Sequence, residues 1–141
     1  MITEANWAYA AGIIDGEGSL VMRLHSNGGI QIHIAVVTRG DPIPNWMMQT
    51  FGGAVYLARE VYHTWSLPTS RQAEFLQGIL PYVQLKRPQV ELLLAGIETR
   101  VASGGRISQP TRLVRVRLCS LLTKEKDLWR QEKYADIAEG T

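Results

Sequence analysis

Apolar and polar positions alternate along the chain in patterns that predict short elements in a regular order. Over residues 3–14, apolar residues recur at helical spacing, and Thr3 followed by an acid is typical of a helix start. Residues 19–27 and 30–37 instead alternate between apolar and polar, as half-buried strands do. Asn27-Gly28-Gly29 between them is a turn signal, so these two strands are expected to form a hairpin.

The same succession continues further along the chain. A short apolar helix is predicted over 45–51, and a second hairpin over 54–60 and 61–67. A third helix is expected from 71 to 80, after the helix-opening Pro-Thr-Ser run. The predicted order of helix, two strands, helix, two strands and helix describes an α+β domain.

Composition supports one globular domain. The chain has 141 residues, of which 45% are hydrophobic, and this is enough to bury a core. Its mean hydropathy of −0.07 is typical of a globular domain. We expect no transmembrane segment and no signal peptide, because the first residues lack a basic start. The single Cys119 excludes an intrachain disulfide and a cysteine-based zinc site, and we interpret it as a small core residue.

Residues 10–18, Ala-Ala-Gly-Ile-Ile-Asp-Gly-Glu-Gly, end the first helix on two acids. A helix C-terminus carries partial negative charge, so Asp15 and Glu17 each cost roughly 0.3 to 1 kcal/mol there. A divalent cation would turn that cost into a binding contribution, and such violations of local preference are typical of functional sites. At about 100° per residue the two acids point to different sides of the helix, so we expect them to have different roles.

The first helix also carries a stripe of small residues. Small side chains at spacing i, i+3, i+4 and i+7 let another helix backbone approach closely. The stripe consists of Ala8, Ala11, Gly12 and Asp15. The opposite stripe is bulky enough to face a core and consists of Trp7, Ala10, Ile13 and Ile14.

Residues 10–18 resemble the signature of the LAGLIDADG homing endonucleases, with the closing Asp-Gly-Glu-Gly an accepted variant. The predicted αββαββα order is the core of that family. Leu80-Pro81-Tyr82 followed by Lys86 is also similar to a recurrent family stretch in which a lysine reaches the cleavage site. The resemblance extends over about residues 3–100 and implies an αββαββα saddle with extra C-terminal helices.

The resemblance also implies a domain organisation. We assign residues 1–124 to a single LAGLIDADG endonuclease domain and 125–141 to a peripheral C-terminal extension. Residues 94–98 superficially repeat the motif, but Thr-Arg-Val follows where Gly-acid-Gly is needed, so we interpret them as helix interior. With one motif, the small-residue stripe is expected to meet its own copy in a two-fold interface. Single-motif members of the family dimerise on near-palindromic DNA, and Asp15 is assigned to capping the partner helix or supporting the interface.

In such a dimer, two copies of Glu17 would lie side by side and repel each other unless cations neutralise them. Mg²⁺, with Mn²⁺ as a substitute, suits the Glu17 carboxylate and the Gly16 carbonyl together with DNA phosphates and water. The resemblance implies that Lys86 stabilises charge or polarises the water network. Thr38-Arg39 stands where many relatives carry a Gln-Lys pair near the scissile phosphate; Thr38 departs from that pattern, and Arg39 is assigned to a phosphate.

The net charge of +2 is unevenly distributed. No acid occurs between Glu17 and Asp41, and a basic two-stranded ribbon suits a major groove. The candidates for contacts to base edges or nearby backbone are Arg23, His25, Asn27, Gln31, His33, Arg39 and Arg59. A second acid-free stretch, between Glu98 and Glu125, is either a phosphate contact surface or a solvated face, with Arg100, Arg106, Arg112, Arg115, Arg117 and Lys124 as its basic residues.

The sequence therefore predicts a site-specific endonuclease that hydrolyses double-stranded DNA with a divalent metal at a long, near-palindromic target. The alternative is a binder without cleavage activity, either an intron maturase with RNA as its partner or a DNA-binding regulator. Expected partners are DNA and a second copy of the chain, with no membrane and no small-molecule cofactor. His25 and His33 are possible cross-strand neighbours without a third ligand, so zinc is not expected. An intracellular location is expected, in a prokaryotic cytoplasm or an organelle that encodes a mobile element.

Overall fold

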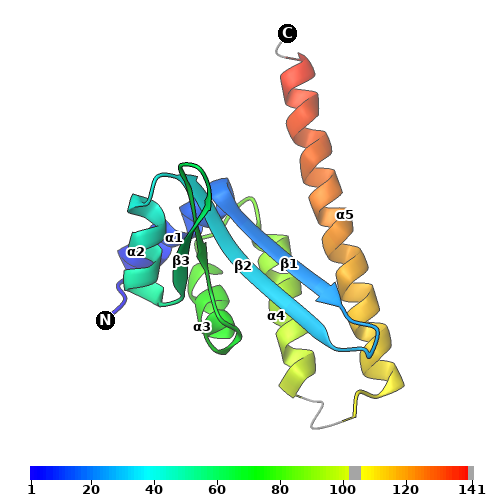
Figure 1. The fold of residues 1–141 in the computed structure, drawn as a ribbon. Coiled ribbons are helices and arrows are strands. Elements are labelled where there is room, and N and C mark those ends of the chain that lie inside the picture. The colour runs from blue at the N-terminus through cyan, green and yellow to red at the C-terminus, as the bar shows by residue number, and fades with distance from the viewer. Residues whose placement is uncertain (102–105, 140–141) are drawn as a thin grey trace.

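The computed structural model describes residues 1–101 and 106–139 and has the predicted order of elements (Figure 1). The αββαββα unit consists of α1(Glu4–Glu17), β1(Gly18–Leu24), β2(Ile30–Arg39), α2(Pro42–Phe51), β3(Ala54–Arg59), β4(Tyr62–Ser66) and α3(Thr69–Ile79). Two further helices follow, α4(Arg87–Val101) and α5(Gln109–Glu139). The predicted α+β class is confirmed, and so is the expectation of extra C-terminal helices.

Both ends of α1 follow from local chemistry. Thr3 caps the first turn: its hydroxyl accepts a hydrogen bond from the Asn6 N–H at 3.1 Å, and the Asn6 side chain accepts one from the Thr3 N–H at 3.0 Å. At the other end, the Gly18 N–H bonds the Ile14 carbonyl. A Cβ at Gly18 would lie 2.7 Å from that carbonyl oxygen, so only glycine allows the chain to turn directly from α1 into β1.

The four strands form one antiparallel sheet in the order β1-β2-β4-β3. The two predicted hairpins are therefore present and are joined through β2 and β4. In the first hairpin, Gly28 has φ +87°, which glycine adopts without strain, and the Asn27 side chain accepts the Gly29 N–H at 2.9 Å. The turn signal in the sequence thus lies where the chain reverses.

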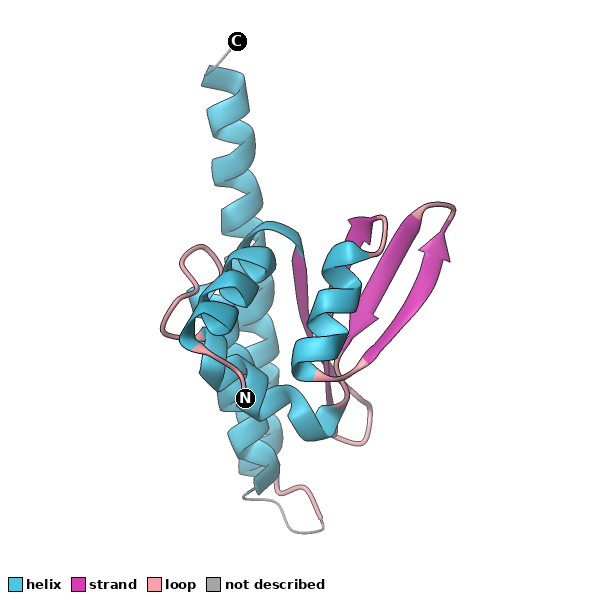
Figure 2. Ribbon diagram, turned by 90° about the vertical axis from the view of Figure 1, so that its left-hand side faces the viewer, coloured by secondary structure: helices cyan, strands magenta, loops and turns pink. Residues whose placement is uncertain are grey.

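Helices cover one face of the sheet and leave the other open (Figure 2). The covered face carries the alternating residues of the strands that are fully buried, Leu20, Ile34, Val36 and Trp65. Beneath them lie packed aromatic rings: Phe75 contacts both Trp65 and Phe51, with ring centroids 5.4 and 5.0 Å away. Trp65 is therefore a core residue.

The helices α4 and α5 pack beside β1 and extend the core beyond the αββαββα unit. A Cβ at Gly96 would lie 2.6 Å from the Met22 sulfur on β1. Within residues 94–98, which superficially repeat the motif, the glycine therefore lets α4 pack closely against β1. Cys119 on α5 is partly buried against the core, and burial raises the pKa of its thiol. Within the described ranges, no helix has both the length and the apolar character needed to cross a membrane.

Helix α5 runs without a break from Gln109 to Glu139 and projects past the edge of the sheet (Figure 1). The boundary expected after residue 124 lies inside this helix. The division into a domain of residues 1–124 and an extension of 125–141 stays a prediction, and the helix itself gives no sign of a boundary there.

Candidate cleavage site and nucleic-acid interface

The two acids at the end of α1 have different environments. Asp15 is half-buried, and its carboxylate accepts the backbone N–H groups of Gln84 and Lys86, both at 2.9 Å. Glu17 is exposed, and within the described residues its side chain makes no hydrogen bond or ion pair. Asp15 therefore fastens the loop before α4 within its own chain, and its assignment to capping a partner helix or supporting the interface stays a prediction. Glu17 is the acid left available for a ligand.

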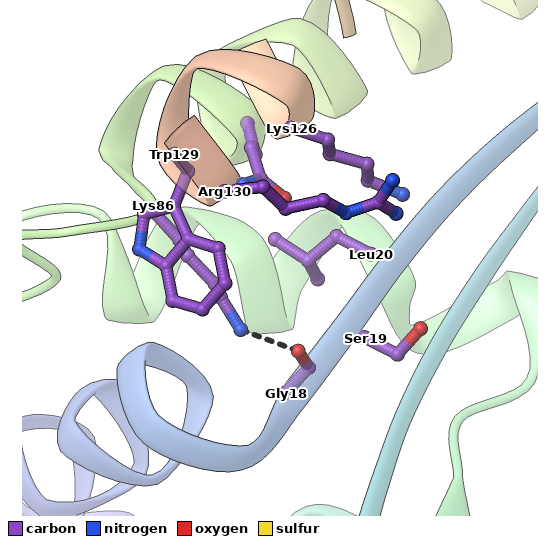
Figure 3. Close-up of a pocket in the computed structure, with 8 residues that line it drawn as sticks. Gly18, Ser19, Leu20, Lys86, Lys126, Trp129 and Arg130 are labelled. Carbon is purple, nitrogen blue, oxygen red and sulfur yellow. Dashed lines mark hydrogen bonds between the residues drawn. The ribbon is translucent and has the colours of Figure 1, made fainter. Parts of the chain in front are cut away.

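The Lys86 side chain lies next to the end of this motif. Its ammonium donates a hydrogen bond to the Gly18 carbonyl at 2.5 Å, and Gly18 directly follows Glu17 in the chain (Figure 3). The ammonium also lies 5.7 Å from the centroid of the Trp129 ring, on α5. Lys86 is only 9% exposed, so its side chain has a defined direction. The residues predicted for catalysis from opposite halves of the domain, Glu17 and Lys86, thus belong to one region of the molecule.

The open face of the sheet carries most of the predicted nucleic-acid contacts. Arg23 and Gln31 are cross-strand partners, and His33 is paired with Val21 in the next row on the same face. These four residues line a hollow of about 170 Å³, and the three polar ones are exposed. His33 therefore does not pair with His25, which lies beyond the end of β1, and the expected cross-strand neighbourhood of the two histidines is wrong.

A second row of side chains crosses the far end of the same face. Arg39, Tyr62 and Arg59 are partners across β2, β4 and β3, and all three are exposed. The Thr38 side chain points to the opposite face of the sheet, beside His63. Its hydroxyl donates a hydrogen bond to the Gly40 carbonyl at 3.1 Å. Adjacent strand residues point to opposite faces, so Thr38 points away from the face that carries Arg39, and the assignment of Arg39 to a phosphate stays a prediction.

No protein-family model matches the chain, and no curated protein sequence matches it. Solved structures do match it. The archaeal intron-encoded homing endonuclease I-Vdi141I, complexed with DNA, has a TM-score of 0.74 at 16% identity, over 86% of this chain and 84% of that one. The homing endonuclease I-CvuI, in complex with its target in the presence of Ca, has a TM-score of 0.72 at 18% identity, over 86% and 82%. The homing endonuclease I-TnaI has a TM-score of 0.62 at 12% identity, over 87% and 97%.

The chain has the fold of the LAGLIDADG homing endonucleases. Residues 10–18, which resemble the LAGLIDADG signature and are called the LAGLIDADG motif below, form the last two turns of α1 and its junction with β1. The resemblance read from the motif and the order of elements is therefore confirmed by the whole architecture.

The LAGLIDADG motif offers oxygen ligands to a metal ion, but only part of a coordination shell. Within the described part of the chain, no group of three or more His, Cys, Asp or Glu residues could hold a metal ion. Glu17 supplies one exposed carboxylate, and Gly16 beside it is exposed with open space around it. Carboxylate and carbonyl oxygens suit hard cations such as Mg²⁺, which commonly keep several waters and take phosphate oxygens as ligands. The residues present therefore fit a divalent cation whose remaining ligands come from elsewhere.

The exposed stripe of small residues on α1 overlaps the predicted stripe only in part. Ala11 is completely buried in its own chain, which corrects its assignment to a dimer interface. Ala8 and Gly12 are exposed as expected, and Gly16 extends the stripe by one turn. A Cβ at Gly12 or at Gly16 would meet nothing within 4 Å. The surface free to meet another helix is therefore formed by Ala5, Ala8, Gly12 and Gly16.

Two arginine side chains of the second acid-free stretch, between Glu98 and Glu125, point into the protein. Arg115 is 3% exposed and donates to the Gly28 carbonyl at 2.8 Å and to the Thr99 hydroxyl at 2.9 Å. Arg100 donates to the Ile30 carbonyl at 3.0 Å, and burial, then the charge of Arg115, lowers its pKa. These two arginines hold the tip of the first hairpin against α4 and α5, so they are not a phosphate surface. Arg106, Arg117 and Lys124 are exposed.

Proposed function

We propose that the protein is a site-specific endonuclease that hydrolyses phosphodiester bonds of double-stranded DNA as a homodimer, with Mg²⁺ as its metal. The observation that carries the proposal is the contrast between the two acids of the LAGLIDADG motif. Asp15 is engaged by two backbone N–H groups, whereas Glu17 is exposed, with the Lys86 ammonium at the next residue. A structural acid would have a partner, so the position of Glu17 favours a role in binding a ligand.

The open sheet face supports DNA as that ligand. It carries three exposed arginines with an exposed glutamine and histidine, and no acid occurs from residue 18 to residue 40. Arginine and glutamine make bidentate contacts to guanine and adenine in a major groove, which admits a two-stranded ribbon. The similar structures of I-Vdi141I and I-CvuI are described as complexes with DNA. The candidate contacts on this face are Arg23, Gln31, His33, Arg39 and Arg59.

Homodimer formation is supported by the incomplete metal site and by the exposed stripe of α1. One chain carries one LAGLIDADG motif and therefore one available carboxylate at this place. A two-fold pairing through Gly12 and Gly16 would bring a second Glu17 beside the first, because an isologous interface repeats the same contacts. Glycine inside a helix costs roughly 0.5 to 1 kcal/mol relative to alanine, so two exposed glycines on one stripe favour a helix-packing role.

The chemistry assigned to the chain's own residues follows from these positions. Glu17 would hold the cation through its carboxylate, and a bound cation would lower the pKa of a water molecule and stabilise the attacking and leaving oxygens. Lys86 is directed to the same place by the Gly18 carbonyl and can donate to a phosphate oxygen as negative charge develops there. Asp15 holds the backbone of Lys86, so it positions that lysine without touching the DNA. Arg39 neutralises a phosphate at the other end of the face.

The decisive experiment is Mg²⁺-dependent cleavage of a library of long, near-palindromic duplexes, with sequencing of the cut ends. The native chain is compared with Glu17→Gln and with Glu74→Gln, which removes an exposed acid from α3 as a matched control. We expect double-strand cuts at one preferred site, lost in Glu17→Gln and kept in Glu74→Gln. Binding without cuts by the native chain would favour the non-cleaving alternative, and cleavage by Glu17→Gln would overturn the assignment of the acid.

A further inference from the structure

A hollow of about 190 Å³ lies between the start of β1 and the outer half of α5, beside the predicted cleavage site (Figure 3). Its floor is the first residues of β1 after the LAGLIDADG motif. The side chains that define it come from the loop before α4 and from α5, and they are Lys86, Lys126, Trp129 and Arg130. The α5 residues lie in the segment that the sequence assigned to a peripheral extension.

The hollow gathers positive charge from segments far apart in the sequence. Lys126 and Arg130 are one helical turn apart on α5 and extend toward β1, on the side where Lys86 reaches Gly18 (Figure 3). Burial lowers the pKa of Lys126, and the neighbouring charges of Arg130, Lys86 and Arg23 lower it further. The ion pair of Arg130 with Asp127 is long, at 3.7 Å, and exposed, so it offsets little of this charge. Like charges brought together in this way favour the binding of an anion.

The position of the hollow indicates which anion. Its lining begins at Gly18, the residue after Glu17, and includes Ser19, which lies on the open face of the sheet. A DNA strand with one phosphate at Glu17 therefore continues past the mouth of this hollow. An arginine and a lysine side by side suit a phosphate, because the guanidinium binds two of its oxygens and the ammonium adds a point charge.

We propose that Lys126 and Arg130 bind a backbone phosphate of the DNA next to the cleaved phosphate, to which Lys86 donates. The inference rests on the proposed function and gives the outer half of α5 a part in holding the substrate. Trp129 acts as a positioning residue, because its ring lies over the Lys86 ammonium on the side facing α5.

The test compares two double variants that each remove two positive charges from α5. Lys126→Gln/Arg130→Gln removes the cations of the hollow, and Arg117→Gln/Lys124→Gln removes two exposed cations elsewhere on the helix. Affinity for the duplex that the native chain cleaves best is measured in EDTA against salt concentration. A second series replaces single phosphates of that duplex by uncharged methylphosphonates. Thermal unfolding checks that both variants fold like the native chain.

We expect the log–log salt slope of the first variant to be smaller by about 1.8 than that of the control, which is about 0.9 for the one phosphate neutralised by each subunit of the dimer. One methylphosphonate next to the cleaved bond should weaken binding by the native chain and the control, and leave binding by Lys126→Gln/Arg130→Gln unchanged. Equal slopes, or equal sensitivity at every phosphate, would overturn the inference while leaving cleavage by the native chain, and with it the proposed function, intact. Failure of the native chain to bind any duplex would overturn both.

Discussion

The Asp15 carboxylate accepts the backbone N–H of Lys86 at 2.9 Å, and the Lys86 ammonium returns to the Gly18 carbonyl at 2.5 Å. Lys86 donates both hydrogen bonds, one from its backbone and one from its side chain, and together they fasten the loop before α4 to the end of α1. The first acid of the LAGLIDADG motif determines where the lysine backbone lies, and the end of the motif determines where the lysine side chain points. Structure and candidate chemistry are therefore coupled through this pair of residues.

We expect Asp15→Asn to lower the free energy of unfolding by about 1 to 3 kcal/mol, because each N–H bonds a different carboxylate oxygen and the amide replaces one of them by an NH₂ group that cannot accept. Urea unfolding followed by circular dichroism measures the loss. Glu17→Gln is the matched control. Its carboxylate is exposed at a helix C-terminus, so neutralising it should leave stability unchanged or raise it by a few tenths of a kcal/mol. Equal losses in the two variants would contradict the division between a structural and a ligand-binding acid.

Replacing Lys86 by Met keeps the length and apolar body of the side chain and removes the ammonium. We expect single-turnover cleavage to slow by roughly 10²- to 10³-fold, the usual effect of removing one donor to developing charge. Affinity for DNA should fall much less, because Lys86 is one of several phosphate-binding cations. Cleavage and binding are measured on the same duplex. A variant that loses affinity and cleavage in the same proportion would show that Lys86 serves binding alone.

The order of elements and the two faces of each strand could be predicted because each rests on a local pattern, whereas the register that separates His25 from His33 could not. Strand alternation follows from the two faces of a sheet, and the first turn required a glycine at the position where φ is +87°. The candidates on the open face followed from the same alternation. Tyr62 was missed there. It lies three residues before Trp65 on β4, so strand alternation places it on the face opposite to that core residue.

The core side of α1 could be predicted, because Trp7, Ile13 and Ile14 identify it, but the exact border of the exposed face could not. Ala10 and Ala11 are both completely buried, whereas Ala8 and Gly12 are exposed. Small residues near the border carry too little side chain for periodicity alone to assign them to one face. Burial in the folded chain decides, and it moves the candidate interface from Ala11 to Gly16.

Gly12→Leu tests the homodimer. The helix has open space at Gly12, so the monomer should fold with unchanged or slightly higher stability, while leucine would prevent close approach of a second α1. We expect analytical ultracentrifugation to show a dimer for the native chain and a monomer for the variant. Gln49→Leu places the same side chain at an exposed position of α2 and should remain dimeric. A monomeric native chain, or a dimeric Gly12→Leu, would contradict an interface formed by this stripe.

Charge runs could not reveal which arginines face inward, because that depends on how α5 lies against the first hairpin. Arg115→Lys should therefore cost about 1 to 3 kcal/mol of stability, since an ammonium cannot bond Gly28 and Thr99 together. Hydrogen exchange should accelerate at the hairpin tip. The same change at exposed Arg117, two residues along α5, should alter neither quantity. Unchanged exchange in Arg115→Lys would show that the tip is held by other contacts.

The hydroxyl of Tyr82 donates to the Glu4 carboxylate at 2.9 Å and joins the loop before α4 to the first turn of α1. This hydrogen bond, then burial and the charge of Glu4, raises the pKa of Tyr82 above 10.0. Because the folded value exceeds the unfolded one, the contribution to stability is present below pH 10 and is lost as pH rises through the folded pKa.

Titration of ¹³C-labelled tyrosine by NMR resolves this residue from the other tyrosines of the chain. Glu4→Gln should bring the pKa of Tyr82 back toward 10 because both the hydrogen bond to a carboxylate and its negative charge are removed. Tyr56, exposed on β3, is an internal reference that should not change between the two proteins. An identical Tyr82 titration with and without the carboxylate would mean that the contact between α1 and this loop does not persist in solution. The loop that carries Lys86 would then keep its contacts with Asp15 and Gly18 but lose the one with Glu4.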